Sequence, residues 1–147
     1  MVNQVSVSEA RALQLSGSTY VDVRSTPEFA HGHPSGAVNV PLLEPDEDTG
    51  QMLPNPDFLR VLQAIFNPDT PLLIGCQVSG RSVRAAQVLE AIGFRNLSVV
   101  RGGFQGSRDP IGRPVDPGWA ESGLPVATGT GGATGYHDLL ARADHAR

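Results

Sequence analysis

Lysine is absent from this chain, because all 11 basic residues are arginines. Schiff-base enzymes need a lysine amine and P-loops need a lysine cation, so both kinds of chemistry are excluded. Acidic residues outnumber basic ones, and the formal net charge is −4. Since nucleic-acid-binding proteins are usually basic, we expect no nucleic-acid partner.

Cysteine is nearly absent as well, with Cys76 as the single example. One cysteine forms no disulfide within the chain and leaves no resolving thiol, so a self-contained dithiol redox cycle is excluded. The N-terminal residues lack a basic region followed by an apolar run, and no stretch approaches the length of a membrane span. The sequence therefore predicts a cytoplasmic protein without membrane contact, in which a free thiol stays reduced.

Aromatic residues are scarce at 5 %, so we expect a core built from valine, leucine, alanine and isoleucine. The 147 residues suffice for one domain with its own core. Segments with helical and strand patterns alternate along the chain, and the connections between them are short. This alternation predicts an α/β fold, with a central, mostly parallel sheet and helices on both of its faces.

Caps, prolines and apolar runs give the expected elements. A capping box formed by Ser6 and Glu9 opens the first helix, and Gly17 stops it. Further helices are predicted over 25–30, 58–66 and 82–92, and strands over 19–24, 37–41, 72–75 and 97–100. Residues 31–36 are expected to form a turn, and the acidic, proline-rich residues 44–57 a surface loop.

The character of the sequence changes near its C-terminal end. We expect the domain to cover residues 1–126, with Trp119 and Leu124 packing back on its body. Glycine and threonine dominate residues 127–135, which predicts a flexible linker. Residues 136–147 form a short C-terminal segment with a helical pattern, which could dock on the domain, contact a partner or fray.

Cys76 stands between an apolar strand over 72–75 and the helix over 82–92. A thiol at a helix N-terminus has its thiolate stabilised by the helix dipole and by free backbone N–H groups. This placement favours an anionic sulfur nucleophile. The alternative is a buried cysteine that merely ends a strand, since free cysteine often serves as a small core residue.

Other charged residues near Cys76 are candidates for a supporting role. Asp22 and Arg24 share one face of a strand, and Glu28 follows closely. We interpret these three as an ion network that holds a loop, with direct catalysis as the alternative. His31 and His33 have no cysteine nearby and make a poor zinc site, so no metal and no other cofactor is expected.

Three separated motifs resemble those of single-domain rhodaneses, which are sulfurtransferases that carry sulfur as a cysteine persulfide. The motifs are Tyr20–Arg24 with Glu28-Phe29, Gly32-His33, Gly36-Ala37 and Asn39–Pro41; Cys76–Arg81; and Val100–Phe104. Together they span about residues 5–126, and their order and spacing make the match specific. The sequence departs from the family pattern twice, with Ser79 where many members have glycine and Phe104 where tryptophan is common.

The resemblance implies that the loop from Cys76 to Arg81 curls around the sulfur, so that its N–H groups form an anion-binding concavity. The Cys76 thiolate would take sulfur from a donor such as thiosulfate and pass it from the persulfide to cyanide or a thiol. The loop residues Gln77, Val78, Ser79, Gly80, Arg81 and Ser82 would bind the anion. No cofactor is implied.

Within this loop, several side chains have two interpretations. Arg81 is a candidate for donor recognition, because its guanidinium matches an oxyanion, or it is a surface cap of the following helix. Ser82 is expected to cap the helix N-terminus. Gln77 and Val78 would shape access to the sulfur, and Arg84 is expected to be an ordinary exposed arginine.

Two other functions compete with sulfur transfer by a free-standing enzyme. A phosphatase or arsenate reductase is disfavoured, because four residues separate Cys76 from Arg81 and tetrahedral phosphate needs a wider ring of N–H donors. A sulfur-carrier or docking module, loaded by a partner desulfurase, would use the same cysteine. The acidic residues 44–48 and the terminal segment 136–147 could serve such partner contacts.

Overall fold

A five-stranded parallel sheet forms the centre of the computed structural model, which describes residues 2–130, 132 and 134–145. Its strands lie in the order β1-β8-β7-β2-β4, and every neighbouring pair is parallel. Their bounds are β1 (Asn3–Val5), β2 (Thr19–Asp22), β4 (Val38–Asn39), β7 (Leu72–Gly75) and β8 (Leu97–Val100). Strand β7 is central and all four of its residues are buried, as expected for a parallel strand covered on both faces.

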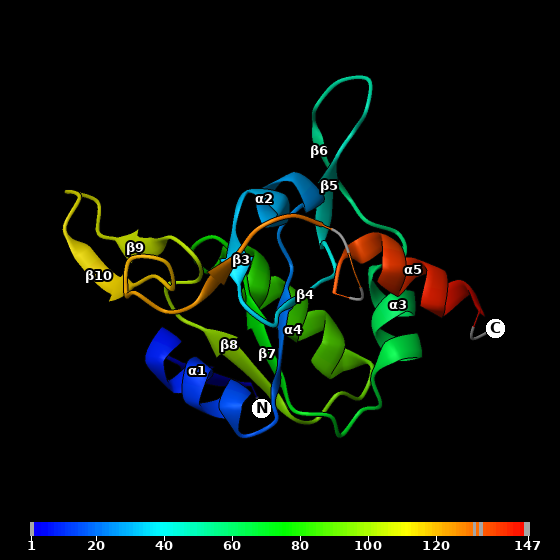
Figure 1. The fold of residues 1–147 in the computed structure, drawn as a ribbon, viewed down its shortest axis with the longest axis horizontal. Helices are drawn as coiled ribbons and strands as arrows, with labels where there is room; N and C mark the ends of the chain where they lie inside the picture. The colour runs from blue at the N-terminus through cyan, green and yellow to red at the C-terminus, as the bar shows by residue number, and fades with distance from the viewer. Residues whose placement is uncertain (1, 131, 133, 146–147) are drawn as a thin grey trace.

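Helices cover both faces of this sheet, as the sequence predicts. They are α1 (Val7–Leu15), α2 (Thr26–His31), α3 (Phe58–Ile65), α4 (Gly80–Ala91) and α5 (Tyr136–His145). Val7 of α1 and Phe29 of α2 belong to the core cluster that includes Leu73 and Trp119, whereas α3, α4 and α5 share a cluster with Ile74 on the opposite face. In Figure 1, α1 lies to the left of β7 and β8, and α3 and α5 lie to their right.

Local sequence signals set the starts of the first two helices. Ser6 and Glu9 form the predicted capping box at α1, with each side chain bonded to the other's backbone N–H. Ser25 and Glu28 form a second capping box at α2, followed by Pro27 in the first turn. The second box matters for the site, because it fixes the position of the Glu28 carboxylate.

Three small antiparallel pairs lie outside the central sheet, and the sequence-based predictions missed all of them. Their strands are β3 (His33–Pro34) with β11 (Val126–Ala127), β5 (Leu43–Pro45) with β6 (Met52–Pro54), and β9 (Gly106–Arg108) with β10 (Pro114–Pro117). The predictions of a turn over 31–36 and a loop over 44–57 were therefore wrong in part. Each strand has at most four residues and most are partly exposed, so none carries a clear apolar period.

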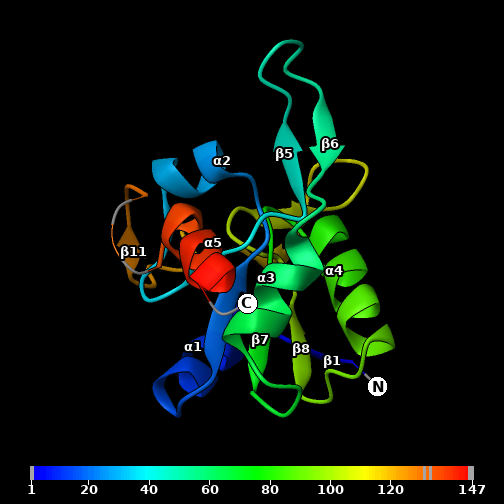
Figure 2. The same cartoon turned by 90° about the vertical axis from the view of Figure 1, so that its right-hand side faces the viewer.

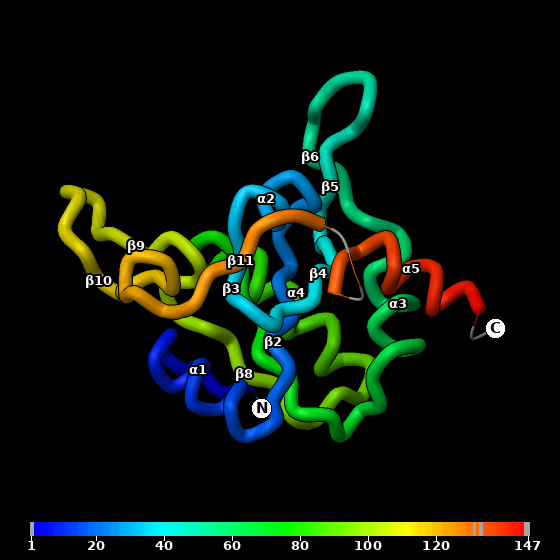
Figure 3. Tube along the Cα trace, in the orientation of Figure 1, coloured from blue at the N-terminus to red at the C-terminus, as the bar shows by residue number. Residues whose placement is uncertain are grey.

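The pair β5–β6 forms a hairpin that projects beyond the rest of the molecule, as Figure 2 shows at the top. Figure 3 shows β3 and β11 side by side, although more than 90 positions separate them along the chain. This pairing holds the segment after Trp119 against α2. Trp119 itself is fully buried, as predicted, and Leu124 packs against the same cluster.

The C-terminal helix α5 docks on the domain, which is one of the three outcomes left open for residues 136–147. Leu139 is fully buried, and Tyr136 and Ala143 join it in the core cluster with α3. The segment predicted as a linker is hydrogen-bonded to the body, since Gly129 N–H donates to the Ala30 carbonyl and Thr134 accepts from the Asn39 N–H. The predictions for residues 131, 133, 146 and 147 lie outside the described residues.

No helix within the described ranges is long and apolar enough to cross a membrane.

Candidate active site

Cys76 directly follows β7 at the carboxyl edge of the sheet, and its side chain is almost fully buried. The backbone N–H of Ser82 donates to the Cys76 Sγ at 3.4 Å, and the Ser82 Oγ lies 3.5 Å from the same sulfur. The Ser82 hydroxyl donates to the carbonyl of Ser79 at 2.7 Å. The thiol therefore sits against the first turn of α4, at the positive end of the helix dipole.

Ser82 does not cap α4, so that prediction was wrong. The helix begins at Gly80, and Ser79 occupies the N-cap position without a side-chain cap bond. Ser82 lies inside the first turn, where its hydroxyl is buried between the sulfur and a backbone carbonyl. The serine is thus placed to contact the sulfur rather than to start the helix.

The backbone of the loop leaves donors open. Among the hydrogen bonds of the described residues, none uses the backbone N–H of Gln77, Val78 or Ser79. Ser79 has a φ of −164°, an extended value that any residue adopts. Serine at this position therefore costs no backbone strain, and the loop needs no glycine there.

The loop that contains Gly103, Phe104 and Gln105 supports the cysteine loop through backbone hydrogen bonds. The N–H of Phe104 donates to the Cys76 carbonyl at 2.8 Å, and the N–H of Gln105 donates to the Gln77 carbonyl at 2.9 Å. Gly103 makes this approach possible, since its φ is +56° and a Cβ there would clash with the Cys76 carbonyl. The motif over 100–104 thus acts as a support for the cysteine loop.

Asp22 and Arg24 form a buried ion pair beside the loop. The Arg24 Nη2 lies 2.8 Å from Asp22 Oδ2, and the two side chains are 3 % and 1 % exposed. Arg24 also donates to the Gly32 carbonyl and, at 2.9 Å, to the Gln77 side chain. The Phe104 ring lies under its guanidinium, 4.5 Å from the ring centre. Arg24 thus ties β2 to both loops.

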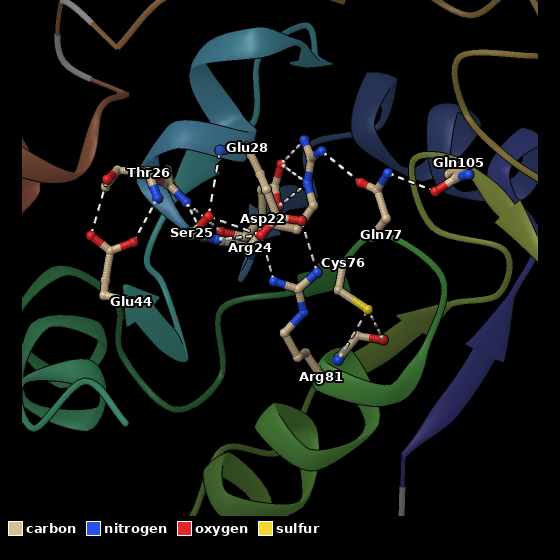
Figure 4. A network of polar contacts seen from close by, with 12 residues as sticks. Asp22, Arg24, Ser25, Thr26, Glu28, Glu44, Cys76, Gln77, Arg81 and Gln105 are labelled. Atoms are coloured by element: carbon tan, nitrogen blue, oxygen red, sulfur yellow. Dashed lines mark hydrogen bonds and ion pairs between the residues drawn. The ribbon is translucent and has the colours of Figure 1, made fainter. Parts of the chain in front are cut away.

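Glu28 and Arg81 form a second, more exposed pair. The two Arg81 Nη atoms donate to the two Glu28 carboxylate oxygens at 2.6 and 2.9 Å. Figure 4 shows Arg81 directed from the start of α4 toward Glu28 on α2. The hydrogen bonds from Arg81 lower the pKa of Glu28 to about 2, with help from Ser25 and against the opposing effect of burial.

The structure therefore brings every predicted site residue to one edge of the sheet, but changes the role of some. Val78 is an exposed residue of the cysteine loop, and Gln77 links Arg24 to Gln105. Arg81 is neither a helix cap nor an open guanidinium, because Glu28 occupies its donor fork. The sequence analysis gave no role to Phe104 or Gln105. The two glycines before them, Gly102 and Gly103, were the signal that could have indicated a supporting loop.

Asp22 pairs with Arg24, and Glu28 pairs with Arg81, so these side chains connect loops and helix ends; their supporting role in place of direct catalysis stays a prediction. His33 is buried, stacks on the Phe29 ring and bonds through Nδ1 to the Phe29 carbonyl, which is a structural arrangement. Within the described part of the chain, no three His, Cys, Asp or Glu side chains cluster as metal ligands would.

The family model described as "Rhodanese-like domain" matches residues 6–109. The chain belongs to the rhodanese-like domain family. The matched range runs from the first helix through β9, and includes the cysteine loop and both ion pairs.

Relatives of this rhodanese-like domain include two named thiosulfate sulfurtransferases of Arabidopsis thaliana. "Thiosulfate sulfurtransferase 16, chloroplastic" is 36 % identical, with 84 % of this chain and 92 % of that protein covered. "Thiosulfate sulfurtransferase 18" is 38 % identical over 70 % of this chain and 76 % of that protein. A third Arabidopsis relative, "Protein HIGH ARSENIC CONTENT 1, mitochondrial", is 33 % identical over 70 % of this chain and 60 % of that protein.

A solved structure supports the same fold. The crystal structure of Rv0390 from M. tuberculosis superposes with a TM-score of 0.70 and 26 % identity, covering 87 % of this chain and 98 % of that one. The rhodanese-like fold predicted from the sequence is therefore confirmed.

Proposed function

We propose that this rhodanese-like domain is a sulfurtransferase in which Cys76 carries the transferred sulfur as a persulfide. Two relatives bear the name thiosulfate sulfurtransferase, and we take thiosulfate as the donor to test first. The observation that carries the proposal is the Cys76 sulfur itself, which accepts the Ser82 N–H at the start of a 12-residue helix. That position stabilises an anionic sulfur.

The reaction proceeds in two half-reactions. The Cys76 thiolate attacks the outer sulfur of thiosulfate, an S–S bond forms to Cys76, and the S–S bond within thiosulfate breaks as sulfite leaves with the electron pair. A thiolate or cyanide then attacks the outer sulfur of the persulfide, and Cys76 leaves as thiolate. The sequence is covalent catalysis with ping-pong kinetics, and no cofactor enters it.

The loop supplies electrostatic stabilisation to both anionic forms of Cys76. The Ser82 N–H contacts Sγ, and the open N–H groups of Gln77, Val78 and Ser79 are available to an anion above it. Backbone N–H groups held in place by the fold stabilise developing negative charge without reorganisation. A donor oxyanion would use these N–H groups, because the Arg81 guanidinium is already bonded to Glu28.

Arg81 is then a positioning residue. Its bond to Glu28 connects the first turn of α4, which holds the sulfur, to the capped start of α2. The prediction that Arg81 recognises the donor is replaced here by the proposal that it fixes the loop. The two differ in a measurable way, since loss of a positioning residue lowers kcat whereas loss of donor binding raises mainly the KM for thiosulfate.

The first experiment is the intact mass of the protein before and after thiosulfate, and again after cyanide. Persulfide transfer predicts a gain of one sulfur atom, which cyanide removes as thiocyanate. Cys76→Ser is the matched control and should show neither the gain nor turnover. Turnover retained by Cys76→Ser would refute the proposal.

Two alternatives are tested with the same protein. Arsenate reduction gains some support from the relative named for high arsenic content, and a phosphatase would need the same cysteine. Turnover of arsenate with a thiol reductant, or of a phosphate ester, in the absence of sulfur transfer would favour one of these. If a desulfurase loads Cys76 but thiosulfate does not, the chain acts in a sulfur relay between proteins.

The cytoplasmic location stays a prediction.

A further inference from the structure

An apolar groove of about 530 Å³ runs beside the cysteine loop, between α3, α4 and the base of the β5–β6 hairpin. Its volume lies in the range of small-molecule sites. Its walls are largely hydrocarbon, with Leu42, Pro56, Phe58, Leu59 and Val88 among the lining residues. Nothing in the proposed sulfur chemistry so far uses this space.

One end of the groove reaches the first turn of α4, where Gly80 and Arg81 line it. The next residue, Ser82, donates its backbone N–H to the Cys76 sulfur. A Cβ added at Gly80 would meet nothing within 4 Å, so the wall is open at this point. A molecule lying in the groove would therefore place its end next to the loop that carries the sulfur.

One charge at the groove, that of Arg84, suits an anionic ligand group. Arg84 lines the groove, is exposed, and has no ion pair within the residues that the structure describes. Of the nearby carboxylates, Asp57 pairs with Arg60, and both Glu44 oxygens accept hydrogen bonds from Thr26 rather than from Arg84. Among the described residues, Arg84 is therefore a cation without a carboxylate partner at the rim of the apolar groove.

We propose that this groove binds the sulfur acceptor, a small thiol with an apolar body and a carboxylate that pairs with Arg84. The role as acceptor site rests on the proposed sulfurtransferase function. The acceptor thiolate attacks the outer sulfur of the Cys76 persulfide, forming a new S–S bond. The bond between that sulfur and Cys76 breaks, and its electron pair stays on Cys76 as thiolate, so no other reactant is needed.

Direct binding tests the groove without any sulfur chemistry. The probes are butanoate, hexanoate and octanoate, titrated into the full chain by calorimetry. Because burial of each methylene contributes about 0.8 kcal/mol, the affinity should rise about threefold to fourfold per added CH₂ until the groove is filled. Absence of octanoate binding, or affinities that do not depend on chain length, would overturn the proposal.

Two substitutions locate the binding. Arg84→Gln should weaken octanoate binding up to about fivefold, as expected for one exposed ion pair. Val88→Asp should reduce it more strongly, because it places a charge in the apolar wall. The matched controls are Arg113→Gln, on the β9–β10 hairpin, and Ile92→Asp, at the exposed C-cap of α4 and outside the groove. Equal effects in test and control variants would contradict the assignment.

Acceptor kinetics connect the groove to the reaction. With thiosulfate as donor, 8-mercaptooctanoate should give a higher kcat/KM than mercaptoacetate, and octanoate should inhibit competitively against the longer thiol. No preference for the longer thiol would overturn the acceptor role. Cyanide as acceptor for the unmodified protein decides the sulfurtransferase function separately. A concentration-dependent dimer that excludes octanoate would show that a second copy fills the groove, and would also overturn the proposal.

Discussion

The two arginine–carboxylate pairs beside Cys76 differ most in their contact with water. Asp22 and Arg24 are 1 % and 3 % exposed, and the arginine has further partners in Gly32, Gln77 and Phe104. Glu28 and Arg81 are 32 % and 23 % exposed, and the arginine contacts one residue through both of its Nη atoms. The first pair is part of the core, whereas the second lies between the site and solvent.

This difference in exposure gives the two ion pairs different roles in the site. Removal of one partner from a buried pair leaves an uncompensated charge, which the interior tolerates poorly. A partly exposed pair is screened by water, and either partner is solvated when the pair opens. Arg24 therefore fixes the scaffold on which both loops rest, and Arg81 sets the position of the sulfur-bearing turn at a lower energetic cost.

The largest effect is expected from Arg24→Ala. This change leaves the Asp22 carboxylate buried without its partner and should lower the free energy of unfolding by about 3–5 kcal/mol, as measured by urea denaturation. Arg95→Ala, which breaks an exposed pair with Asp69, is the matched control and should cost less than about 1 kcal/mol, as exposed ion pairs generally do. Similar losses in the two variants would remove the distinction between buried and exposed pairs.

A smaller loss of stability is expected from Glu28→Gln. The amide oxygen can still accept from Ser25, but the charged bond to Arg81 is lost, so the free energy of unfolding should fall by about 1 kcal/mol. The rate should respond more clearly than the stability, with a decrease in kcat for sulfur transfer and little change in the KM for thiosulfate. A fall in this KM with kcat unchanged would show that the released Arg81 binds the donor, and would return Arg81 to the role of donor recognition.

The same pair predicts a pH dependence. The pKa of Glu28 is about 2 in the folded protein, below the ordinary value of 4.5, so the folded state favours the ionised carboxylate. Its contribution is complete above about pH 4.5 and is lost as the pH falls from 4.5 toward 2. The stability difference between the unmodified protein and Glu28→Gln should therefore shrink over this window. A difference that stays constant down to pH 2 would contradict the assignment.

A small effect is also expected at Arg60, which pairs with both Asp57 and Asp144; the pair with Asp144 is 31 % and 56 % exposed. This pair connects α3 to α5 on the surface of the molecule. Arg60→Gln should leave the midpoint of the same denaturation series nearly unchanged, because water screens this exposed pair. A loss comparable to that of Arg24→Ala would show that burial does not order these three pairs.

The position of Cys76 could be predicted because local sequence determines it. The four apolar residues of β7 and the amphipathic residues of α4 are contiguous, so the cysteine between them had to lie at a strand-to-helix junction. The capping box at Ser6 and Glu9 is local in the same way. These signals depend on neighbours within a few positions, which a single sequence displays.

The partners of the charged residues could not be predicted, because they come from distant parts of the chain. Arg24 and Gln77 are 53 positions apart, and so are Glu28 and Arg81. The support from Phe104 to the Cys76 carbonyl likewise depends on how β8 pairs with β7. The role of Ser82 was mistaken because the helix starts at Gly80, two residues earlier than expected. Ser79 and Ser82 both fit the sequence pattern of an N-cap, and Ser79 occupies that position.

The pairing of the first strand has a consequence for how the chain folds as it is synthesised. Asn3 of β1 pairs with Ser98 of β8, and α5, at the other end of the chain, closes the core cluster over α3. The N-terminal strand must therefore wait for most of the chain to leave the ribosome before it gains a neighbour. Long-range parallel pairing of this kind slows folding and leaves apolar surface open in the meantime.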